Sequence, residues 1–347
     1  MKYIALPLLA FVFAFPAWAQ SDIESILSNA RSLERNNNFA EAAAEMSKAI
    51  ALEPKNTHYL FEQAQYYERA KDETNFLKDI DQALILEPDN ETTVMDAARY
   101  LFQDANPTHC ERSLVIVNEF LLKHPQSDKA YSARFFIKQC LDDQAGAFND
   151  ISAAIELKPE YALYQANRAN LISRMGDSKL ALQLLQTLIT TLEAKLSHVT
   201  DRSEVDPIKR DLGMSLHQVS IVYERGGDKK LAIEALTEAI RYGPDARYGP
   251  NIYVRERALA YSRFGMYNEA ITEFTQAIAD QEELVAKYKY VLPNVRLYLE
   301  RGDTFYAAGE YTKALDDYRE CLRLDDRNKA LYEKHIDRVN QKLGSSN

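Results

Sequence analysis

Hydrophobic residues recur along the chain at helical spacing, in runs that short polar turns separate. In residues 227–244, 264–278 and 308–324, Gly or Asn marks a turn, a small Ala follows, and an apolar or aromatic residue stands four positions later. Another small residue comes after it. The pattern predicts an all-α chain built from pairs of helices. Only 11 residues are Gly, which disfavours a loop-rich all-β fold because hairpins consume glycine.

Prolines and small residues give the pattern a period. Pro54, Pro88, Pro125 and Pro159 end helical runs at intervals of 34, 37 and 34 residues. Small residues also fill one column in each helix of a pair, as expected where two helices cross closely. The second-helix column is Ala42, Ala147, Ala181, Ala232, Ala270 and Ala314. The first-helix column, twelve positions earlier in its unit, is Ala30, Ala64, Ala98, Ala169, Ala258 and Gly302.

A 34-residue period that ends in proline is the length of the tetratricopeptide repeat, and the chain resembles that family. The resemblance covers nearly the whole chain after residue 20, in eight units: about 23–56, 57–90, 91–126, 128–161, 162–195, 213–246, 251–284 and 295–328. It implies a right-handed superhelical solenoid in which each unit is stabilised by its neighbours. Units two to four depart from the pattern, because Phe76, Ser113 and Phe135 replace small residues.

An amphipathic segment follows the last unit. Residues 328–342 are predicted to form a C-terminal capping helix that covers the end of the array. We expect Ala330, Leu331, Ile336 and Val339 to face inward and the charged residues to face outward.

Residues 1–19 have the features of a secretory signal peptide. Lys2 precedes an apolar run from Tyr3 to Phe15, and Ala17-Trp18-Ala19 forms a small-x-small cleavage site. The run is shorter than the roughly 20 residues that a membrane anchor needs. We therefore expect cleavage after Ala19, a periplasmic or secreted protein, and no stable membrane insertion of the mature chain. The short charged start suits bacterial export, and eukaryotic secretion stays an alternative.

Two intervals exceed the period. Ala181 to Ala232 spans 51 residues, and Ala270 to Ala314 spans 44. The excess predicts overlong helices near 190–212 and 279–292, with a break at about 198–200. These helices are either solvated insertions or a docking surface, since insertions in repeat arrays often map to one face. They suggest two continuous parts of the mature chain, 20–198 with repeats 1–5 and 199–347 with repeats 6–8 and the capping helix.

Charge and motifs argue against nucleic-acid binding, catalysis and cofactors. The formal net charge of −10 disfavours a nucleic-acid-binding surface. None of the 6 His forms an HExxH motif or stands beside a CxxC pair, so no metal site is expected. No GxGxxG, GxxxxGK or GxSxG motif provides a phosphate loop or a nucleophile elbow. We predict a protein that is not an enzyme and has no cofactor.

Opposite charges repeat in register inside three units. An arginine stands one residue before the first-helix small column, and an acidic residue stands sixteen residues later. The pairs are Arg134 with Asp150, Arg257 with Glu273, and Arg301 with Asp317. Such charges could form a ligand site, but their spacing favours an ion pair that braces the two helices of one unit. An exposed pair of this kind contributes about 0–1 kcal/mol.

The resemblance also implies where a partner binds, because tetratricopeptide arrays bind extended or helical peptides on the concave face of the first helices. Five units end the first helix in arginine: Arg35, Arg69, Arg174, Arg225 and Arg263. A row of arginines can bind carboxylates bidentately. A basic residue is nevertheless common in this column of the family, and Glu adjoins three of the five. Nearby apolar candidates are Phe61, Met95, Leu259 and Tyr306. The Lys-Asn set with which some members clamp a chaperone C-terminus is missing from the matching columns.

Cys110 and Cys140 are candidates for a disulfide. Cys110 is predicted at the start of a second helix and Cys140 at the end of the next first helix, and antiparallel neighbours bring such ends together. An exported chain enters an oxidising compartment. Closing this loop would stabilise the fold by about 3–4 kcal/mol in the chain-entropy model. The alternative is three unpaired cysteines, and Cys321 is expected to be a buried thiol in either case.

These features predict a non-enzymatic protein–protein interaction scaffold of the bacterial envelope, which binds a peptide or protein in the concave groove. No motif identifies the partner or the oligomeric state. One alternative is a carbohydrate- or peptidoglycan-associated adaptor, since the 21 Tyr could stack on sugars, although this repeat also uses aromatic residues for packing. A less favoured alternative is an enzyme whose site has no recognised motif.

Overall fold

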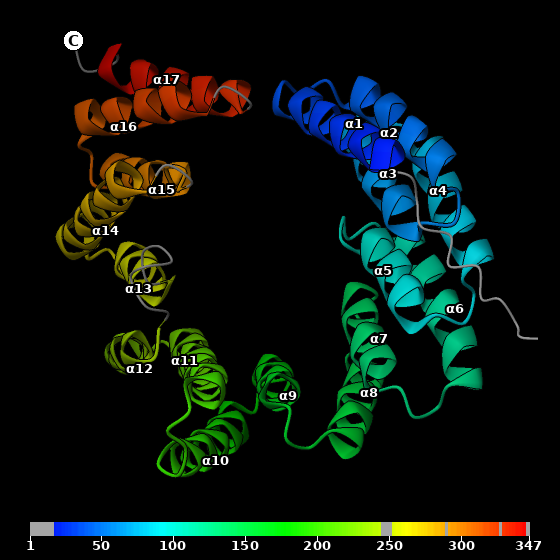
Figure 1. Ribbon diagram of the computed structural model, residues 1–347. Coiled ribbons are helices and arrows are strands. Elements are labelled where there is room, and N and C mark those ends of the chain that lie inside the picture. Colours follow the sequence, from blue (N-terminus) through cyan, green and yellow to red (C-terminus); the bar gives the residue numbers. More distant parts are fainter. Residues whose placement is uncertain (1–16, 244–251, 289–290, 326–327, 345–347) are drawn as a thin grey trace, which may run out of the picture. The chain divides into compact units, whose positions relative to one another are not determined.

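Short helices joined by tight turns make up the described chain, which comprises residues 17–243, 252–288, 291–325 and 328–344 of a computed structural model (Figure 1). These residues form seventeen α-helices and no strand. They are an all-α repeat solenoid, as the sequence predicts. The chain divides into two units, Met1–Lys123 and His124–Asn347, which are described separately.

The first unit contains three helix pairs. Its helices are α1 (Ala17–Arg35), α2 (Phe39–Leu52), α3 (Thr57–Arg69), α4 (Glu73–Leu86), α5 (Glu91–Phe102) and α6 (Pro107–Lys123). Each helix packs against the next one along the chain. Residues 1–16 of the predicted signal peptide lie outside the described residues. Helix α1 begins inside the predicted cleavage motif, and export stays a prediction.

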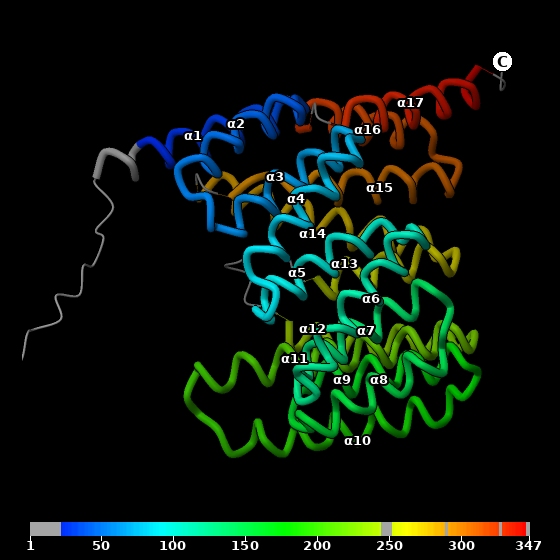
Figure 2. Tube along the Cα trace, turned by 90° about the vertical axis from the view of Figure 1, so that its right-hand side faces the viewer, coloured from blue at the N-terminus to red at the C-terminus, as the bar shows by residue number. Residues whose placement is uncertain are grey.

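The second unit contains five helix pairs and a final single helix. The helices are α7 (Asp128–Cys140), α8 (Gln144–Leu157), α9 (Ala162–Arg174), α10 (Ser178–Leu196), α11 (Arg202–Arg225), α12 (Lys229–Arg241), α13 (Ile252–Arg263), α14 (Tyr267–Lys287), α15 (Val295–Ala307), α16 (Tyr311–Leu324) and α17 (Lys329–Gly344). They follow one another in chain order along the stack (Figure 2). The predicted division at 199 falls between α10 and α11, which pack on each other, and it stays a prediction.

The turn inside each helix pair contains one residue in the left-handed conformation. In repeats 1–4 these residues are Asn37, Lys71, Ala105 and Asp142, and in repeats 5–8 they are Gly176, Gly227, Gly265 and Gly309. Several second helices then begin with an aspartate cap. The side chains that accept a hydrogen bond from the backbone N–H three residues later are those of Asp72, Asp143, Asp177 and Asp228. A left-handed residue followed by a cap reverses the chain within a few residues.

Both predicted columns of small residues are buried. At Gly302, a Cβ atom would lie 2.8 Å from the Tyr318 ring, so the crossing of α15 and α16 has no room for one. The larger residues that depart from the pattern, Phe76, Ser113 and Phe135, are also at most 3% exposed. Their helices therefore still form buried crossings, but these crossings contain different side chains from those of the other repeats.

The helices end where the prolines and the overlong intervals of the sequence predict. Helices α2, α4, α6 and α8 each end two residues before the proline of their repeat. Helix α10 ends at Leu196 and α14 continues to Lys287, as the overlong intervals predict. The prediction for Pro244, the proline of the sixth unit, lies outside the described residues. No helix in the described part of the chain has an apolar stretch long enough to cross a membrane.

The predicted capping helix is present as α17, but part of its predicted inner face is wrong. Val339 is fully buried and Ile336 is half-buried, whereas Ala330 and Leu331 are exposed. Tyr332 is buried instead, and its hydroxyl donates a hydrogen bond of 2.8 Å to Asp325 Oδ2. The helix thus turns a tyrosine inward because its hydroxyl has a partner there.

Candidate functional site

Four of the five arginines that end first helices connect their repeat to the preceding one. In the first unit, Arg69 Nη1 lies 2.5 Å from Glu34 Oε1, and its guanidinium also stacks 4.3 Å from the Phe39 ring centre. In the next repeat Gln103 occupies the same column and donates a hydrogen bond of 2.9 Å to Glu68. The acceptor stands one position before the arginine column of the preceding repeat. The pattern is therefore a ladder of contacts between repeats.

The ladder continues inside the second unit with three arginines. Arg174 donates to Gln139 Oε1 at 2.6 Å, and Arg225 donates to Ser173 Oγ at 2.6 Å. Arg263 makes two hydrogen bonds to Glu224, of 2.5 and 2.9 Å, which form a bidentate ion pair. The sequence therefore locates the column correctly, and the structure adds a stabilising role for it that sequence reasoning missed.

Arg35 belongs to the first repeat of the described residues. Its Nε donates to the Arg31 carbonyl oxygen at 3.2 Å. Together with Leu27 and Glu34 it lines an open cavity of about 570 Å³ on α1. Arg35 is thus the arginine of this column that faces a hollow on the first helix of the array.

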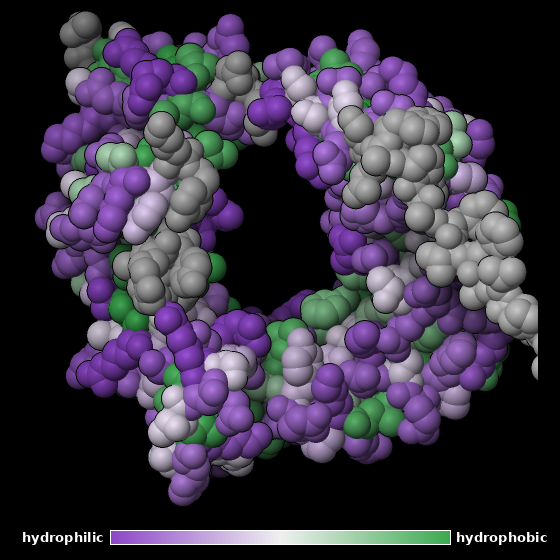
Figure 3. Space-filling model, viewed as in Figure 1, coloured by the Kyte–Doolittle hydropathy of each residue, from purple (hydrophilic) through white to green (hydrophobic). Residues whose placement is uncertain are grey.

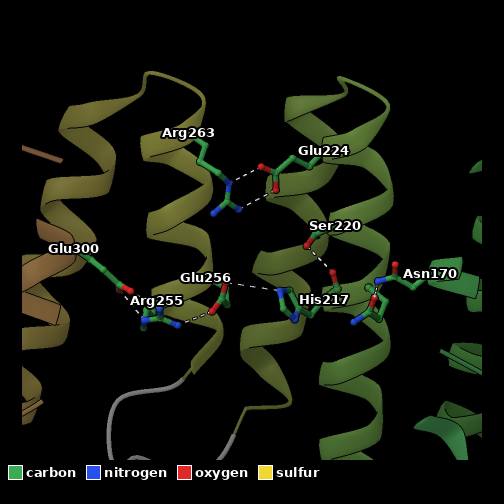
Figure 4. A network of polar contacts seen from close by, with 9 residues as sticks. Asn170, His217, Ser220, Glu224, Arg255, Glu256, Arg263 and Glu300 are labelled. Atoms are coloured by element: carbon green, nitrogen blue, oxygen red, sulfur yellow. Dashed lines mark hydrogen bonds and ion pairs between the residues drawn. The ribbon is translucent and has the colours of Figure 1, made fainter. Parts of the chain in front are cut away.

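A second row of polar side chains crosses four first helices of the second unit (Figure 4). Asn170 on α9 donates to Gln218 on α11 at 2.6 Å. On α11, His217 Nε2 lies 3.9 Å from Glu256 of α13. Arg255 of α13 contacts Glu256 at 2.7 Å and also pairs with Glu300 of α15. We call this chain of contacts, from Asn170 to Glu300, the inner polar row.

The inner polar row is half-buried, and its electrostatics differ along its length. The Arg255 and Glu300 side chains are each 12% exposed, whereas His217 and Glu256 are 28% and 21% exposed. Burial lowers the pKa of His217, although the Glu256 carboxylate opposes the shift. Burial is the largest single influence on the pKa of Arg255 and acts to lower it, but the hydrogen bonds and charges of Glu300 and Glu256 together outweigh burial, so the pKa is raised. The row therefore carries the Arg255 cation between the Glu256 and Glu300 carboxylates, and the His217 imidazole, whose neutral form burial favours.

The apolar groove candidates are placed unequally. Phe61 is only 3% exposed and stacks on Tyr100 with 5.4 Å between ring centres, so it belongs to the core and cannot contact a partner. Met95 and Leu259 are half-buried. Tyr306 is also half-buried, and the Arg338 guanidinium covers it 4.0 Å from the ring centre. On the visible face of the second unit, hydrophilic residues predominate and apolar patches are small (Figure 3).

The predicted ion pairs inside repeats are confirmed. Nε and Nη2 of Arg134 donate hydrogen bonds to the Asp150 carboxylate, at 2.9 and 2.6 Å. Nε and Nη2 of Arg301 donate to the Asp317 carboxylate in the same way, at 2.9 and 2.7 Å. Arg257 and Glu273 form the third pair: Nε lies 3.2 Å and Nη2 2.5 Å from the carboxylate oxygens. We call these three contacts the bracing pairs, because each joins the two helices of one repeat.

The second repeat has the acidic member of this column without its arginine. Asp79 is 8% exposed, and its Oδ2 has no hydrogen-bond partner among the described residues. Gln63 stands sixteen residues earlier, where repeats 4, 7 and 8 have the arginine of a bracing pair, and donates instead to Ala43 O and Ser47 Oγ, both at 2.6 Å. Burial raises the pKa of Asp79 to about 7. Sequence reasoning missed this residue, although column alignment with Asp150 could have found it.

The cysteines lie at the helix positions that the sequence predicts. Cys110 is in the first turn of α6, in the first unit, and Cys140 is the last residue of α7, in the second unit. A Cys110–Cys140 disulfide stays a prediction, which non-reducing peptide mapping tests: one free thiol per exported chain supports it and three reject it. Cys321 is fully buried and free, and burial raises its pKa to about 12.

Two of the overlong helices of the second unit, α10 and α11, pack on each other. Leu188, Ile189 and Leu192 of α10 are each 4% exposed, in a cluster with Leu212 of α11. In α14, Gln281 donates to the Leu292 carbonyl oxygen at 3.0 Å. The first insertion thus joins the apolar core of the repeats beside it. Both interpretations, solvated insertion and docking surface, stay open.

Comparison with known proteins identifies the repeat. Sequence profiles described as tetratricopeptide repeat match residues 27–91 and 295–328. Human tetratricopeptide repeat protein 13 is 28% identical over 120 residues, which are 33% of this chain and 12% of that protein. The chain thus spans only a small part of that relative. These matches and the eight helix pairs of the described residues support a protein of the tetratricopeptide-repeat family.

Solved structures are similar to the chain at low sequence identity. A tetratricopeptide repeat protein from Parabacteroides merdae is 16% identical, with 82% of this chain and 98% of that chain covered and a TM-score of 0.45. The pilF protein of Pseudomonas aeruginosa is 11% identical, with 65% and 93% covered and a TM-score of 0.40. Proteins of this fold are generally scaffolds for protein interactions and typically have no enzymatic activity.

Proposed function

We propose that this protein is an exported, non-enzymatic scaffold of the bacterial envelope, which binds a peptide or protein partner on the first helices of its second unit. The inner polar row is the observation that carries the proposal. It runs over four consecutive first helices and leaves side chains such as His217 and Glu256 between one fifth and one third exposed. Successive repeats that present side chains at a regular spacing suit an extended partner.

The choice of a protein partner over a sugar follows from the tyrosines. Eight tyrosines, including Tyr164, Tyr253 and Tyr298, are at most 9% exposed, so their rings are not free to stack on a carbohydrate. By contrast, the first helices present charged and amide groups, which recognise peptide side chains and backbone. Export is supported by the sequence of residues 1–19.

Site-specific photo-crosslinking in cells tests the binding surface. A photoreactive phenylalanine analogue at Phe136, which is 40% exposed on α7, or at Arg296 on α15 should capture a partner. Phe136 stands in the same repeat column as Asn170 of the inner polar row. The matched controls carry the analogue on second helices, at Lys230 or Arg319, whose side chains are 85% and 63% exposed. Adducts specific to the first helices are expected, and equal capture at the control positions contradicts the proposal.

The export part has its own test. Fractionation and N-terminal sequencing of the native protein should find a periplasmic chain that begins at Gln20. A chain that retains Met1 contradicts export by a cleaved signal peptide and leaves the binding surface to be judged by the crosslinks alone.

A further inference from the structure

The arginines of the inter-repeat ladder fall into two electrostatic classes. Arg69 and Arg263 each pair with a glutamate of the preceding repeat, so the chain itself neutralises their charge. Arg174 and Arg225 also bond to the preceding repeat, but their acceptors are the amide of Gln139 and the hydroxyl of Ser173. Neutral acceptors orient a guanidinium without compensating its charge. These two arginines therefore keep a full positive charge.

The two uncompensated arginines are neighbours. Arg174 ends α9 and Arg225 ends α11, and these helices pack against each other. Both residues are exposed, and neither makes an ion pair with a described residue. Burial and then the charge of Arg174 lower the pKa of Arg225, as expected for two cations at short range. In a chain of net charge −10, this is a local site of positive charge.

We propose that Arg174 and Arg225 together bind side-chain carboxylates of an acidic segment in the partner. This inference rests on the proposed function and names the chemistry of its ligand. Two guanidinium groups held in place by hydrogen bonds can each present a planar pair of donors to a carboxylate. Both side chains are exposed, so the pair can accept internal Asp or Glu residues of a partner chain. Met175 beside it is 52% exposed and offers an apolar contact.

The chain provides its own conservative substitution for the test. In the third repeat Gln103 occupies the arginine column and still donates its inter-repeat hydrogen bond to Glu68. Arg174→Gln and Arg225→Gln should therefore remove the charges and keep the ladder. Arg319→Gln, on α16, removes one positive charge, as each of the two substitutions does, at an exposed position on another helix, and it is the control for a change in net charge. Glu224→Gln should do the opposite, because it releases Arg263 as a third uncompensated cation.

The probe is a short peptide rich in Asp and Glu with both termini blocked. Its counterpart has Asn and Gln at those positions, and a third peptide adds a free terminal carboxylate to that neutral sequence. Binding is measured by fluorescence polarisation at low and high salt, with circular dichroism of each full-length variant to confirm folding. We expect the acidic peptide alone to bind, and the double Gln variant to bind it about tenfold more weakly. Arg319→Gln should bind as the unaltered protein does, and Glu224→Gln should bind more tightly.

Several results would overturn the inference. Equal binding of the neutral peptide, selective binding of the peptide with a free terminal carboxylate, or full affinity in the folded double variant each excludes recognition of internal carboxylates by this pair. Crosslinks at Phe136 or Arg296 that persist in the double variant would leave the scaffold proposal intact while this inference fails. If the protein without the Gln substitutions gives no crosslinks from the first-helix positions, the scaffold proposal itself is contradicted.

Discussion

Repeats 8 and 2 place an acidic side chain at the same position of the second helix, with opposite electrostatic results. In repeat 8, Asp317 is 5% exposed and accepts two hydrogen bonds from Arg301. In repeat 2, Asp79 is about as deeply buried, but Gln63 takes the place of the arginine and turns toward the first repeat. The comparison shows that the electrostatic role of the acidic residue depends on which residue stands sixteen positions earlier in the same repeat.

The pKa values record the difference. Burial raises the pKa of Asp317, but the Arg301 guanidinium opposes that shift. The pKa of Asp79 has no such opposition except from Lys78 and rises to about 7. The nearby Tyr67 hydroxyl also has a raised pKa, first because of burial and then because of the Asp79 charge. Repeat 2 is therefore sensitive to pH near neutrality, and repeat 8 is held by an ion pair.

The largest effect is expected when repeat 8 is made to resemble repeat 2. Arg301→Gln leaves the Asp317 carboxylate buried without a cation. Breaking a buried pair in this way destabilises by about 3 kcal/mol. Urea unfolding of the full chain, followed by circular dichroism, measures the change. The control is Lys230→Gln, which breaks a solvent-exposed pair with Glu234 and should change little. Equal effects of the two substitutions would show that the bracing pair does not stabilise the repeat.

A smaller effect is expected from removing the unpaired carboxylate in repeat 2. The folded protein holds the Asp79 proton more tightly than the unfolded chain, whose pKa is near 3.8. The contribution of this group to stability is therefore greatest at low pH and falls as the pH rises from about 4 to about 7. Asp79→Asn removes the titration. At pH 8 the shift of about 3 pKa units costs the unaltered protein about 4 kcal/mol, at about 1.4 kcal/mol per unit. Burying an amide without a partner offsets about half of that gain, so the substitution should stabilise the fold by about 2 kcal/mol.

The measurement compares unfolding free energies of the unaltered protein and Asp79→Asn at several pH values. The two curves should converge in acid, where the carboxyl is protonated, and separate toward neutral pH. Parallel curves across this range would mean that Asp79 is solvated or paired in solution.

The fold could be predicted because it depends on local patterns. Small residues such as Ala270 mark each helix crossing, and prolines such as Pro159 mark the helix ends. The bracing pairs were also predictable, since both partners lie in one repeat at a fixed separation. Phe61 was assigned wrongly because a column number does not show that Tyr100 of the next repeat covers the ring.

The candidate site depended more on contacts between repeats, which the sequence pattern does not show. The five arginines that end first helices look alike in sequence. The charge of Arg263 is nevertheless neutralised by a glutamate, and that of Arg225 is not. The acceptor lies some 35 to 52 residues earlier, and its identity varies among Glu, Gln and Ser. Asp79 was missed for a related reason: the sequence shows the absence of arginine at 63 but not where Gln63 finds its hydrogen bonds.

The smallest change in stability, and the sharpest test of the comparison, comes from giving repeat 2 the missing arginine. Gln63→Arg places a guanidinium sixteen residues before Asp79, the separation at which Arg301 reaches Asp317. The ion pair gained is offset by the two hydrogen bonds that Gln63 loses to Ala43 and Ser47, so the net change should stay within about 1 kcal/mol. The pKa of Asp79 should nevertheless fall well below 7, because a neighbouring cation favours the carboxylate. Nuclear magnetic resonance titration of the Asp79 carboxyl carbon measures this directly. If Asp79 in the variant still titrates near neutral pH, the arginine column alone does not create the bracing pair, and the geometry of the crossing in repeat 2 must differ from that in repeat 8.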